Sequence, residues 1–367
     1  MRKHPARRRV VPPPYRQRLA ALRAEIAKRE LDGYLILSRM DQYWLTGFTG
    51  EDGLVLVTRR NVVLLTDGRF DEAADLQAPF AQKVLRKQRT PEVNAAIIRR
   101  YRPGRLGFDP AQMSLADYEA LKKHVRPTRL VPVAGTVPAM RVCKDDGEVK
   151  ATRRAIEVAQ EAFERVRRWI RPGRTEREVA ARLEYEMRNL GAQGASFPSI
   201  VAFGRNSSLP HYEPGDVRLK KGDWILVDWG ARVGWYGSDL TRMIWPARPP
   251  RRMVEINQVV REAHDKAIAA ARPGMTCHEL DRVAREHIAS RGYGPQFNHA
   301  LGHGLGLDVH EGPRVGKDTQ TVLQPGMIVT IEPGVYLPGV GGVRIEDDVL
   351  ITKNGCKVLT SLPIAQP

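Results

Sequence analysis

The chain has 367 residues, of which 42% are hydrophobic and 28% are charged. These proportions are typical of a globular protein with two cores, and no stretch approaches the roughly 18 to 20 consecutive apolar residues of a membrane helix. The formal net charge of +17 would suit a nucleic-acid or acidic-membrane partner. Apart from one basic cluster at the N-terminus, however, the charge is spread along the chain. We therefore expect a solvated basic surface, no membrane association and no nucleic-acid partner.

The N-terminal cluster is a basic arm, residues 1–14, with five Lys or Arg residues, no acid and a proline run. It lacks the apolar core of a secretory signal. A transit peptide is an alternative, but the prolines and the absence of Ser disfavour an amphipathic helix, so we expect a disordered arm. Three separated cysteines fit neither a disulfide framework nor a zinc spacing. They predict free thiols and a cytoplasmic protein: Cys143, Cys277 and Cys356.

Residues 15–140 predict a small α/β domain. Apolar residues at helical spacing in "YRQRLAALRAEIAKREL" precede the strand-like runs "DGYLILS", "GLVLVT" and "NVVLLTDG" and the helix-like "PEVNAAIIRRY". The strand-like runs hold no cluster of His, Cys or paired acids. We therefore expect this domain to serve architecture or substrate access.

Residues 147–364, after a linker at about 140–147, contain an internal repeat. "RPGRTEREV" at 171–179 and "RPGMTCHEL" at 272–280 share Arg-Pro-Gly-x-Thr-x-x-Glu, and each Thr-x-x-Glu is a capping box that opens a helix. Downstream, "KGDWILVDWG" aligns with "PGMIVTIEPG" at a similar offset, which places Asp228 opposite Glu332 in the alignment. The repeat predicts two related halves.

Each half contains a hairpin with two acids. In the first half, a two-residue turn at Val233 and Gly234 would place Asp228 opposite Asp239. Like charges directly opposed on one sheet face are destabilising, and here the acids interrupt apolar runs where burial should be greatest. A single pair could instead be splayed into water.

The second hairpin repeats the pattern. A longer turn centred on Gly339 places Glu332 opposite Glu346. Because one pair occurs in each half, we expect four buried carboxylates, and a multivalent cation is the simplest group that neutralises them.

A glycine-rich stretch, "HALGHGLGLDVHEG" at 299–312, supplies three histidines. Four carboxylates and one imidazole suit two hard or borderline ions about 3.5 to 4 Å apart, with a water between them as nucleophile. His303 or a near neighbour would supply the imidazole, which leaves other histidines for hydrogen bonds to substrate. Taken alone, any of these histidines could equally be a satisfied turn residue.

With these motifs the second domain resembles the pita-bread metallopeptidases, the fold shared by methionine aminopeptidase, aminopeptidase P, prolidase and creatinase. "MDQYWLTGFTGEDGLVLVT" and "VVLLTDGRF" resemble the creatinase-type N-terminal domain, and "HALGHGLGLDVHEGP" and "EPGVYLPGVGGVRIEDDV" resemble the Xaa-Pro peptidase branch. The resemblance covers nearly the whole chain and implies an α/β fold. A creatinase-type domain would precede a pita-bread domain with an internal pseudo-two-fold repeat.

The resemblance also implies a metal-ligand set. Asp228 would chelate one ion, His303 and Glu332 would bind the other, and Asp239 and Glu346 would bridge the two ions. A bridging hydroxide would attack the scissile carbonyl. Glu332 would take a proton from the water and pass it to the departing proline nitrogen.

Four further residues match family positions. His310 would steady the tetrahedral intermediate, and His211 and His299 would lie on the substrate side. Arg344 could orient Glu346 by a charge-assisted hydrogen bond; the alternative is a surface strand arginine. The candidate catalytic residues are thus Glu332, His310 and His211, and the candidate substrate-binding residues are His211, His299, His310 and Arg344.

For function, the resemblance implies a dinuclear Xaa-Pro aminopeptidase that acts on peptides with proline at the second position. The alternative is an Xaa-Pro dipeptidase (prolidase); "HEGPRVG" favours the aminopeptidase. A metal-free RNA- or ribosome-binding module and a creatinase-like C–N hydrolase are further alternatives, which the complete ligand set disfavours. We expect Mn²⁺, although Co²⁺, Zn²⁺ or Fe²⁺ would also suit these ligands. By resemblance, we expect a homodimer.

The remaining aromatic and imidazole side chains receive simpler interpretations. Trp224 and Trp229 flank the first acid-bearing strand, and we expect them to pack in the core. The other histidines lie in the arm or in charge-rich helical segments. We expect them to be solvated: His4, His124, His264, His278 and His287.

Overall fold

The computed structural model describes residues 11–367. The chain forms two compact units, and the boundary between them falls between Arg141 and Val142 in the sequence. Over the described range, no helix combines the length and apolar character needed to cross a membrane. Of the arm predicted at residues 1–14, the first ten residues lie outside the described part, and helix α1 already begins at Pro13.

The first unit is built on a six-stranded mixed sheet in the order β4-β3-β2-β1-β5-β6. Its strands are β1 (Gly33–Ile36), β2 (Leu54–Thr58), β3 (Val62–Thr66), β4 (Gln82–Leu85), β5 (Arg105–Phe108) and β6 (Arg129–Pro132). Its helices are α1 (Pro13–Lys28), α2 (Arg39–Thr46), α3 (Asp71–Gln77), α4 (Pro91–Arg100), α5 (Leu115–His124) and α6 (Thr136–Arg141). The three predicted strand runs form β1, β2 and β3, and the predicted helix at "PEVNAAIIRRY" forms α4, so these predictions are confirmed.

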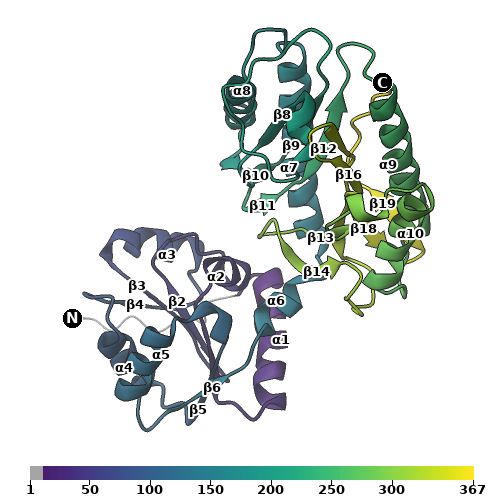
Figure 1. Ribbon diagram of the computed structural model, residues 1–367. Helices are drawn as coiled ribbons and strands as arrows, with labels where there is room; N and C mark the ends of the chain where they lie inside the picture. Colours follow the sequence, from purple (N-terminus) through teal and green to yellow (C-terminus); the bar gives the residue numbers. More distant parts are fainter. Residues whose placement is uncertain (1–10) are drawn as a thin grey trace. The chain divides into compact units, whose positions relative to one another are not determined.

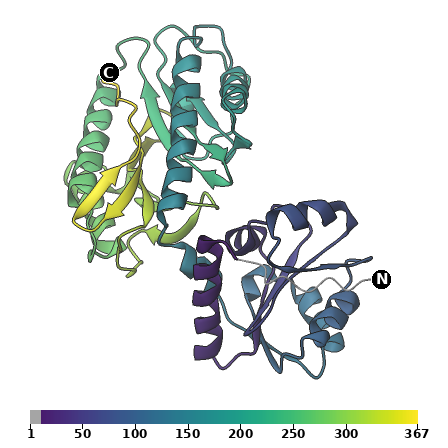
Figure 2. The same cartoon turned by 180° about the vertical axis from the view of Figure 1, so that it is seen from behind.

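Both faces of this sheet are covered, which explains why its central strands read as unbroken apolar runs. Leu35, Leu56 and Val63 pack with residues of α4 and α5 in one core cluster. Helix α1 contacts β1 and β2. Figures 1 and 2 show α1 and α4 on different sides of the strands.

The second unit contains two halves, each with a pair of helices and its own strands (Figure 1). The first half comprises α7 (Asp146–Arg167), α8 (Glu176–Asn189), β7 (Gly194–Ala195), β8 (Ile200–Phe203), β9 (Ile225–Trp229), β10 (Ala231–Val233), β11 (Tyr236–Gly237) and β12 (Leu240–Ile244). The second half comprises α9 (Arg251–Ala270), α10 (Cys277–Ser290), β13 (Gly302–Gly304), β14 (Glu311–Val315), β15 (Ile328–Ile331), β16 (Gly334–Leu337), β17 (Gly341–Arg344), β18 (Asp347–Thr352) and β19 (Gly355–Val358).

The strands of the two halves meet at one point. The first half contains a sheet in the order β12-β9-β8, and the second half a sheet in the order β14-β13-β15-β18-β19. An isolated bridge between Thr241 and Glu346 joins β12 to the residue that precedes β18. Strands from both halves therefore lie next to one another where the acidic residues are.

The predicted repeat is visible in how the second helix of each half begins. Both predicted capping boxes form: the side chain of Thr175 caps α8 together with Glu178, and that of Thr276 caps α10 together with Glu279. The two threonines also form matching isolated bridges, with Arg218 and Val322 respectively. The two halves thus begin their second helices in the same way.

A core cluster lies beneath the helices of each half, and the cluster beneath α9 and α10 also includes residues of the first half. Trp229 is fully buried and stacks on Phe163 of α7 with ring centroids 4.3 Å apart. Trp224 is also buried and packs in the cluster beneath α9 and α10. The prediction that both tryptophans pack in the core is confirmed. The cysteines are free, as predicted.

The turn of the first hairpin lies one residue later than predicted. Val233 pairs with Tyr236, so Gly234 and Trp235 form the turn, and both have positive φ angles, 56° and 74°. A two-residue turn of this kind needs two residues in the left-handed region, so glycine is favoured within it.

Because the turn comes one residue later, Asp228 has a different cross-strand partner. Asp228 pairs with Thr241, so the prediction that it directly opposes Asp239 is wrong. Because side chains alternate along a strand, a shift of two residues keeps the same face toward the site. In the second hairpin, Ile331 pairs with Asp347 and Gly334 with Arg344, which is the predicted register.

Two histidines contradict the prediction of solvated side chains. His264 is only 1% exposed, because it lies on the face of α9 that packs on the core, and its Nε2 lies 3.0 Å from a carboxylate oxygen of Asp347. The side chain of His287 is 8% exposed and contacts Glu262. His124 and His278 are partly exposed, and His4 lies outside the described residues.

The two capping boxes should contribute equally if the halves are related as described. We expect Thr175→Ala and Thr276→Ala each to lower the free energy of unfolding by about 1 kcal/mol, because each leaves a backbone N–H of its helix without a partner. Urea unfolding followed by circular dichroism measures this. The matched Thr→Ser variants keep the hydroxyl and should resemble wild type; an equal loss in the Ser variants would contradict the account.

Candidate metal centre

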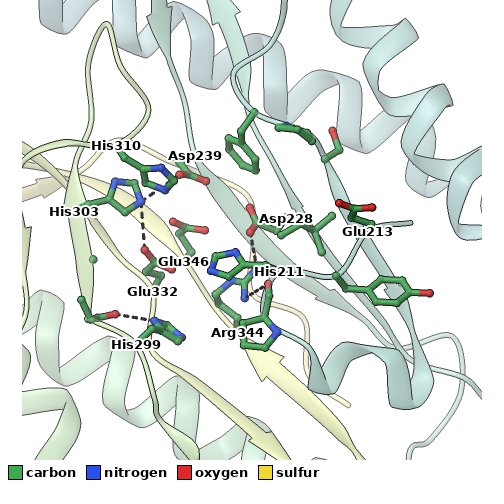
Figure 3. Close-up of a pocket in the computed structure, with 18 of the residues that line it drawn as sticks. His211, Glu213, Asp228, Asp239, His299, His303, His310, Glu332, Arg344 and Glu346 are labelled. Carbon is green, nitrogen blue, oxygen red and sulfur yellow. Dashed lines mark hydrogen bonds and ion pairs between the residues drawn. The ribbon is translucent and has the colours of Figure 1, made fainter. Parts of the chain in front are cut away.

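Five potential ligands lie in strands of both halves or directly beside them. Asp228 lies in β9, Asp239 directly precedes β12, His303 is the middle residue of β13, Glu332 directly follows β15, and Glu346 directly precedes β18. All five line one cavity of about 640 Å³. Figure 3 shows their side chains converging on it, with Glu346 between Glu332 and Asp228.

The ligand atoms are close enough to share ions. One atom each from Asp228, Asp239 and Glu346 lie within 4.8 Å of one another, as do atoms from His303, Glu332 and Glu346. The Nε2 of His303 lies 3.5 Å from an oxygen of Asp239 and 3.4 Å from an oxygen of Glu332. Glu346 belongs to both groups, and such a residue can bridge two ions.

Burial raises the pKa of three of the metal-free carboxyl groups. Burial, with the charges of Glu346 and Asp228, raises the pKa of Asp239 well above its ordinary value. Burial, with Glu332 and Asp228, does the same to the pKa of Glu346, and burial raises the pKa of Glu332 to about 8. Burial lowers the pKa of His303 to about 4, so its imidazole is neutral and able to bind a metal.

The donor set fits divalent cations. Oδ1 of Asp228 is buried and accepts no hydrogen bond from any residue in the described range 11–367, although a buried carboxylate oxygen is costly without a partner. Carboxylate oxygens with one neutral imidazole suit hard or borderline metal ions. A cation would both satisfy this oxygen and relieve the repulsion among the acids.

Arg344 binds and orients Asp228, and it is buried, with 3% of its surface exposed. Its guanidinium donates to Asp228, to the hydroxyl of Thr241 at 3.0 Å and to the hydroxyl of Tyr336 at 2.8 Å. Thr241 in turn donates to Glu346 at 2.7 Å. The arginine is therefore not a surface residue, and it reaches Glu346 through Thr241 rather than directly.

His299 lies at the edge of the cavity but is held by the protein. Its Nδ1 lies 2.7 Å from the carbonyl oxygen of Ala300, and its Nε2 lies 3.1 Å from the hydroxyl of Tyr336. Burial lowers the pKa of His299 to about 4. A neutral ring then donates from Nδ1 and accepts from the tyrosine at Nε2. Both nitrogens are thus engaged within the protein.

The other two histidines are exposed and line the cavity. His310 packs edge-on against His303, with ring centroids 4.3 Å apart. His211 precedes Tyr212 in the loop after β8 and lies beside Arg344 in Figure 3. Both side chains can therefore reach a molecule bound over the acids.

Sequence reasoning missed several residues around the cavity. Arg314 lines it and pairs directly with His303 across β13 and β14. The motif "HEGPRVG" contains this arginine, but the sequence alone assigned it no role. Thr241 and Tyr336 connect Arg344 to other site residues, and neither type stands out in a sequence. Strand pairing brings Arg314 beside His303, and side-chain hydrogen bonds join Arg344 to Thr241 and Tyr336. None of these contacts follows from a local sequence pattern.

Comparisons with known proteins agree with this architecture. The model of metallopeptidase family M24 matches residues 150–353, and the creatinase/prolidase N-terminal domain matches residues 18–143. An uncharacterized peptidase of Bacillus subtilis is 38% identical over 94% of this chain and 98% of its own length. An Xaa-Pro dipeptidase of Pyrococcus horikoshii is 39% identical over 91% of this chain and 93% of its own.

Solved structures are similar over nearly the whole chain. An Xaa-Pro dipeptidase from Bacillus anthracis has a TM-score of 0.93 at 36% identity and covers 96% of this chain and 99% of its own. An X-Pro aminopeptidase from Thermotoga maritima has a TM-score of 0.88 at 34% identity and covers 95% and 99% respectively. The expected order of domains, creatinase-type and then pita-bread, is confirmed. The chain belongs to metallopeptidase family M24 and is a metallopeptidase.

Proposed function

We propose that the protein is an Xaa-Pro dipeptidase that uses two divalent metal ions, with Mn²⁺ the preferred ion. The sequence alone favoured an Xaa-Pro aminopeptidase, and we now propose the alternative, an Xaa-Pro dipeptidase. Two archaeal relatives at 39% and 43% identity are named Xaa-Pro dipeptidase. By family resemblance, we further propose a homodimer.

The observation that carries the dipeptidase assignment is the position of Arg314. Directly paired residues of antiparallel strands point to the same face of the sheet, so Arg314 lies beside His303 at the cavity. The residue is exposed, and a guanidinium binds a carboxylate through two parallel hydrogen bonds. An Xaa-Pro dipeptide carries its terminal carboxylate one residue from the scissile bond, whereas a longer peptide has an amide at that place.

The metal ions would be held by the five converging side chains: Asp228, Asp239, His303, Glu332 and Glu346. Ions bound there would polarise the scissile carbonyl and bring the pKa of a water molecule close to neutrality. The chain itself orients the ligands, since Arg344 holds Asp228 and Thr241 holds Glu346.

Three side chains would handle the substrate and the proton. Glu332, which is half-buried and accepts a hydrogen bond from Thr330 at 3.2 Å, would accept a proton from the attacking water and deliver it to the proline nitrogen. His310 would donate a hydrogen bond to the carbonyl oxygen as charge develops on it. His211 would contact the substrate from the opposite wall. His299 would act through Tyr336 rather than on the substrate.

Substrate length tests the assignment. With Mn²⁺ supplied, we expect kcat/KM for an Xaa-Pro dipeptide to exceed that for an Xaa-Pro-Yaa-Zaa tetrapeptide by at least about tenfold, because only the dipeptide places its carboxylate at Arg314. Mass spectrometry of the products measures both rates. Chelator and the Asp239→Ala variant are the controls, and each should abolish release of Xaa. A preference for the tetrapeptide would return the assignment to an aminopeptidase.

The role of Arg314 has its own test. We expect Arg314→Ala to raise KM for an Xaa-Pro dipeptide about tenfold or more, because a charge-assisted hydrogen bond to the substrate carboxylate is lost. Cleavage of the corresponding Xaa-Pro amide, which has no carboxylate, should change by no more than about twofold. Arg314→Lys keeps the charge without the two-pronged geometry and should lie between. Equal losses on both substrates would contradict this role.

A further inference from the structure

The buried carboxylate of Glu176 lies outside the metal centre. It opens helix α8 and is fully buried. Its Oε1 accepts hydrogen bonds from the backbone N–H of Phe203 at 2.8 Å and the side chain of Asn206 at 2.9 Å. Its Oε2 accepts from the hydroxyl of Tyr212 at 2.7 Å and the backbone N–H of Gly215 at 3.2 Å. Four donors thus surround one buried charge.

All four donors belong to the segment 203–215, which we call the His211 segment. It contains the short 3₁₀ helix η3 (Gly204–Ser208) and otherwise no regular structure after β8. Five consecutive residues of it, 210–214, line the metal-centre cavity. In Figure 3, His211 and Glu213 lie on the side of the site where Asp228 is. This wall of the cavity therefore consists of a loop that no strand pairing of its own holds in place.

The repeat shows that the fold does not require a carboxylate here. The position that corresponds to Glu176 in the second half is Cys277, which opens α10 and is equally buried. The backbone at both positions makes the same contact: Glu176 N donates to the carbonyl oxygen of Val217 at 3.2 Å, and Cys277 N donates to that of Thr321 at 2.8 Å. A thiol at this position is therefore compatible with the fold. The half that bears His211 instead carries a buried charge there, which is costly.

We infer that Glu176 is a positioning residue that holds the His211 segment at the wall of the cavity, where His211 contacts the substrate. The contact with substrate rests on the proposed function. The anchoring itself does not, because it follows from the four hydrogen bonds. A glutamine at this position still accepts hydrogen bonds through its oxygen, but its NH₂ group faces the N–H of Gly215, which can only donate.

Hydrogen exchange tests the anchor without any substrate. In full-length, Mn²⁺-loaded protein, Glu176→Gln should speed exchange about tenfold at backbone amides of residues 203–215, since a charge-assisted hydrogen-bond network is lost. The matched control is Glu186→Gln. Glu186 is a buried carboxylate of the same helix that pairs with Arg182 and Arg165 and contacts no residue of the segment by hydrogen bond. This control should leave exchange at 203–215 unchanged.

A double-mutant cycle tests the connection to His211. Glu176→Gln should lower kcat/KM for an Xaa-Pro dipeptide about tenfold and divide the loss between KM and kcat in the same proportion as His211→Ala. In the His211→Ala background it should add less than about twofold, because a residue that acts through His211 has nothing left to position. Affinity for Mn²⁺ should stay within about twofold of wild type, which a general loss of structure would not allow.

Unchanged exchange at 203–215, or losses that multiply fully in the double variant, would overturn the inference. If Glu176→Gln fails to fold, Tyr212→Phe removes one of the four donors from the loop side and should raise exchange and KM in the same direction. No cleavage of Xaa-Pro peptides by the wild type would instead overturn the proposed function, and the exchange experiment would still decide whether Glu176 anchors the segment.

Discussion

Repulsion among four carboxylates in one cavity is the constraint on which this structure depends. Asp239 and Glu346 are almost fully buried, and burial together with neighbouring charges raises the pKa of both well above ordinary values. Proteins rarely bury such a group without compensation. The guanidinium of Arg344 compensates part of the charge through Asp228, and divalent cations would compensate the rest. The architecture around the cavity is best understood as a means of holding these acids together.

The internal repeat brings these acids together. Each half contributes a hairpin of strands whose ends carry acids, and the bridge between Thr241 and Glu346 places the two sets side by side. Strands and strand ends thus fix the ligands and also carry Arg314, whereas loops carry His211 and His310, which would contact substrate. The His211 segment is anchored by Glu176, and His299, at the edge of the cavity, is held by Tyr336. Strands therefore carry the metal ligands and Arg314, and loops carry the other proposed substrate contacts.

The sequence predicted much of this because its strongest signals are local. The capping boxes at Thr175 and Thr276 follow from four-residue patterns, and the register of Glu332 and Glu346 follows from a turn whose centre is marked by glycine. The register of Asp228 was wrong by two residues because Gly234 could occupy either turn position, and only the backbone geometry distinguishes them. His264 was misassigned because a charge-rich helix still has one buried face. The roles of Arg314 and Glu176 depend on contacts across strands and loops, which no local pattern contains.

The most direct test of the central claim, that cations relieve a cluster of buried acids, is thermal unfolding of wild type and Glu346→Gln at about pH 8, with and without Mn²⁺. Because folding raises the pKa of Glu346, burying it costs stability at a pH where the unfolded chain is ionised. Metal-free Glu346→Gln should therefore unfold at a higher temperature than metal-free wild type. Excess Mn²⁺ should stabilise wild type by several degrees and the variant much less. A metal-free wild type that is the more stable of the two, and that Mn²⁺ does not stabilise, would contradict the account.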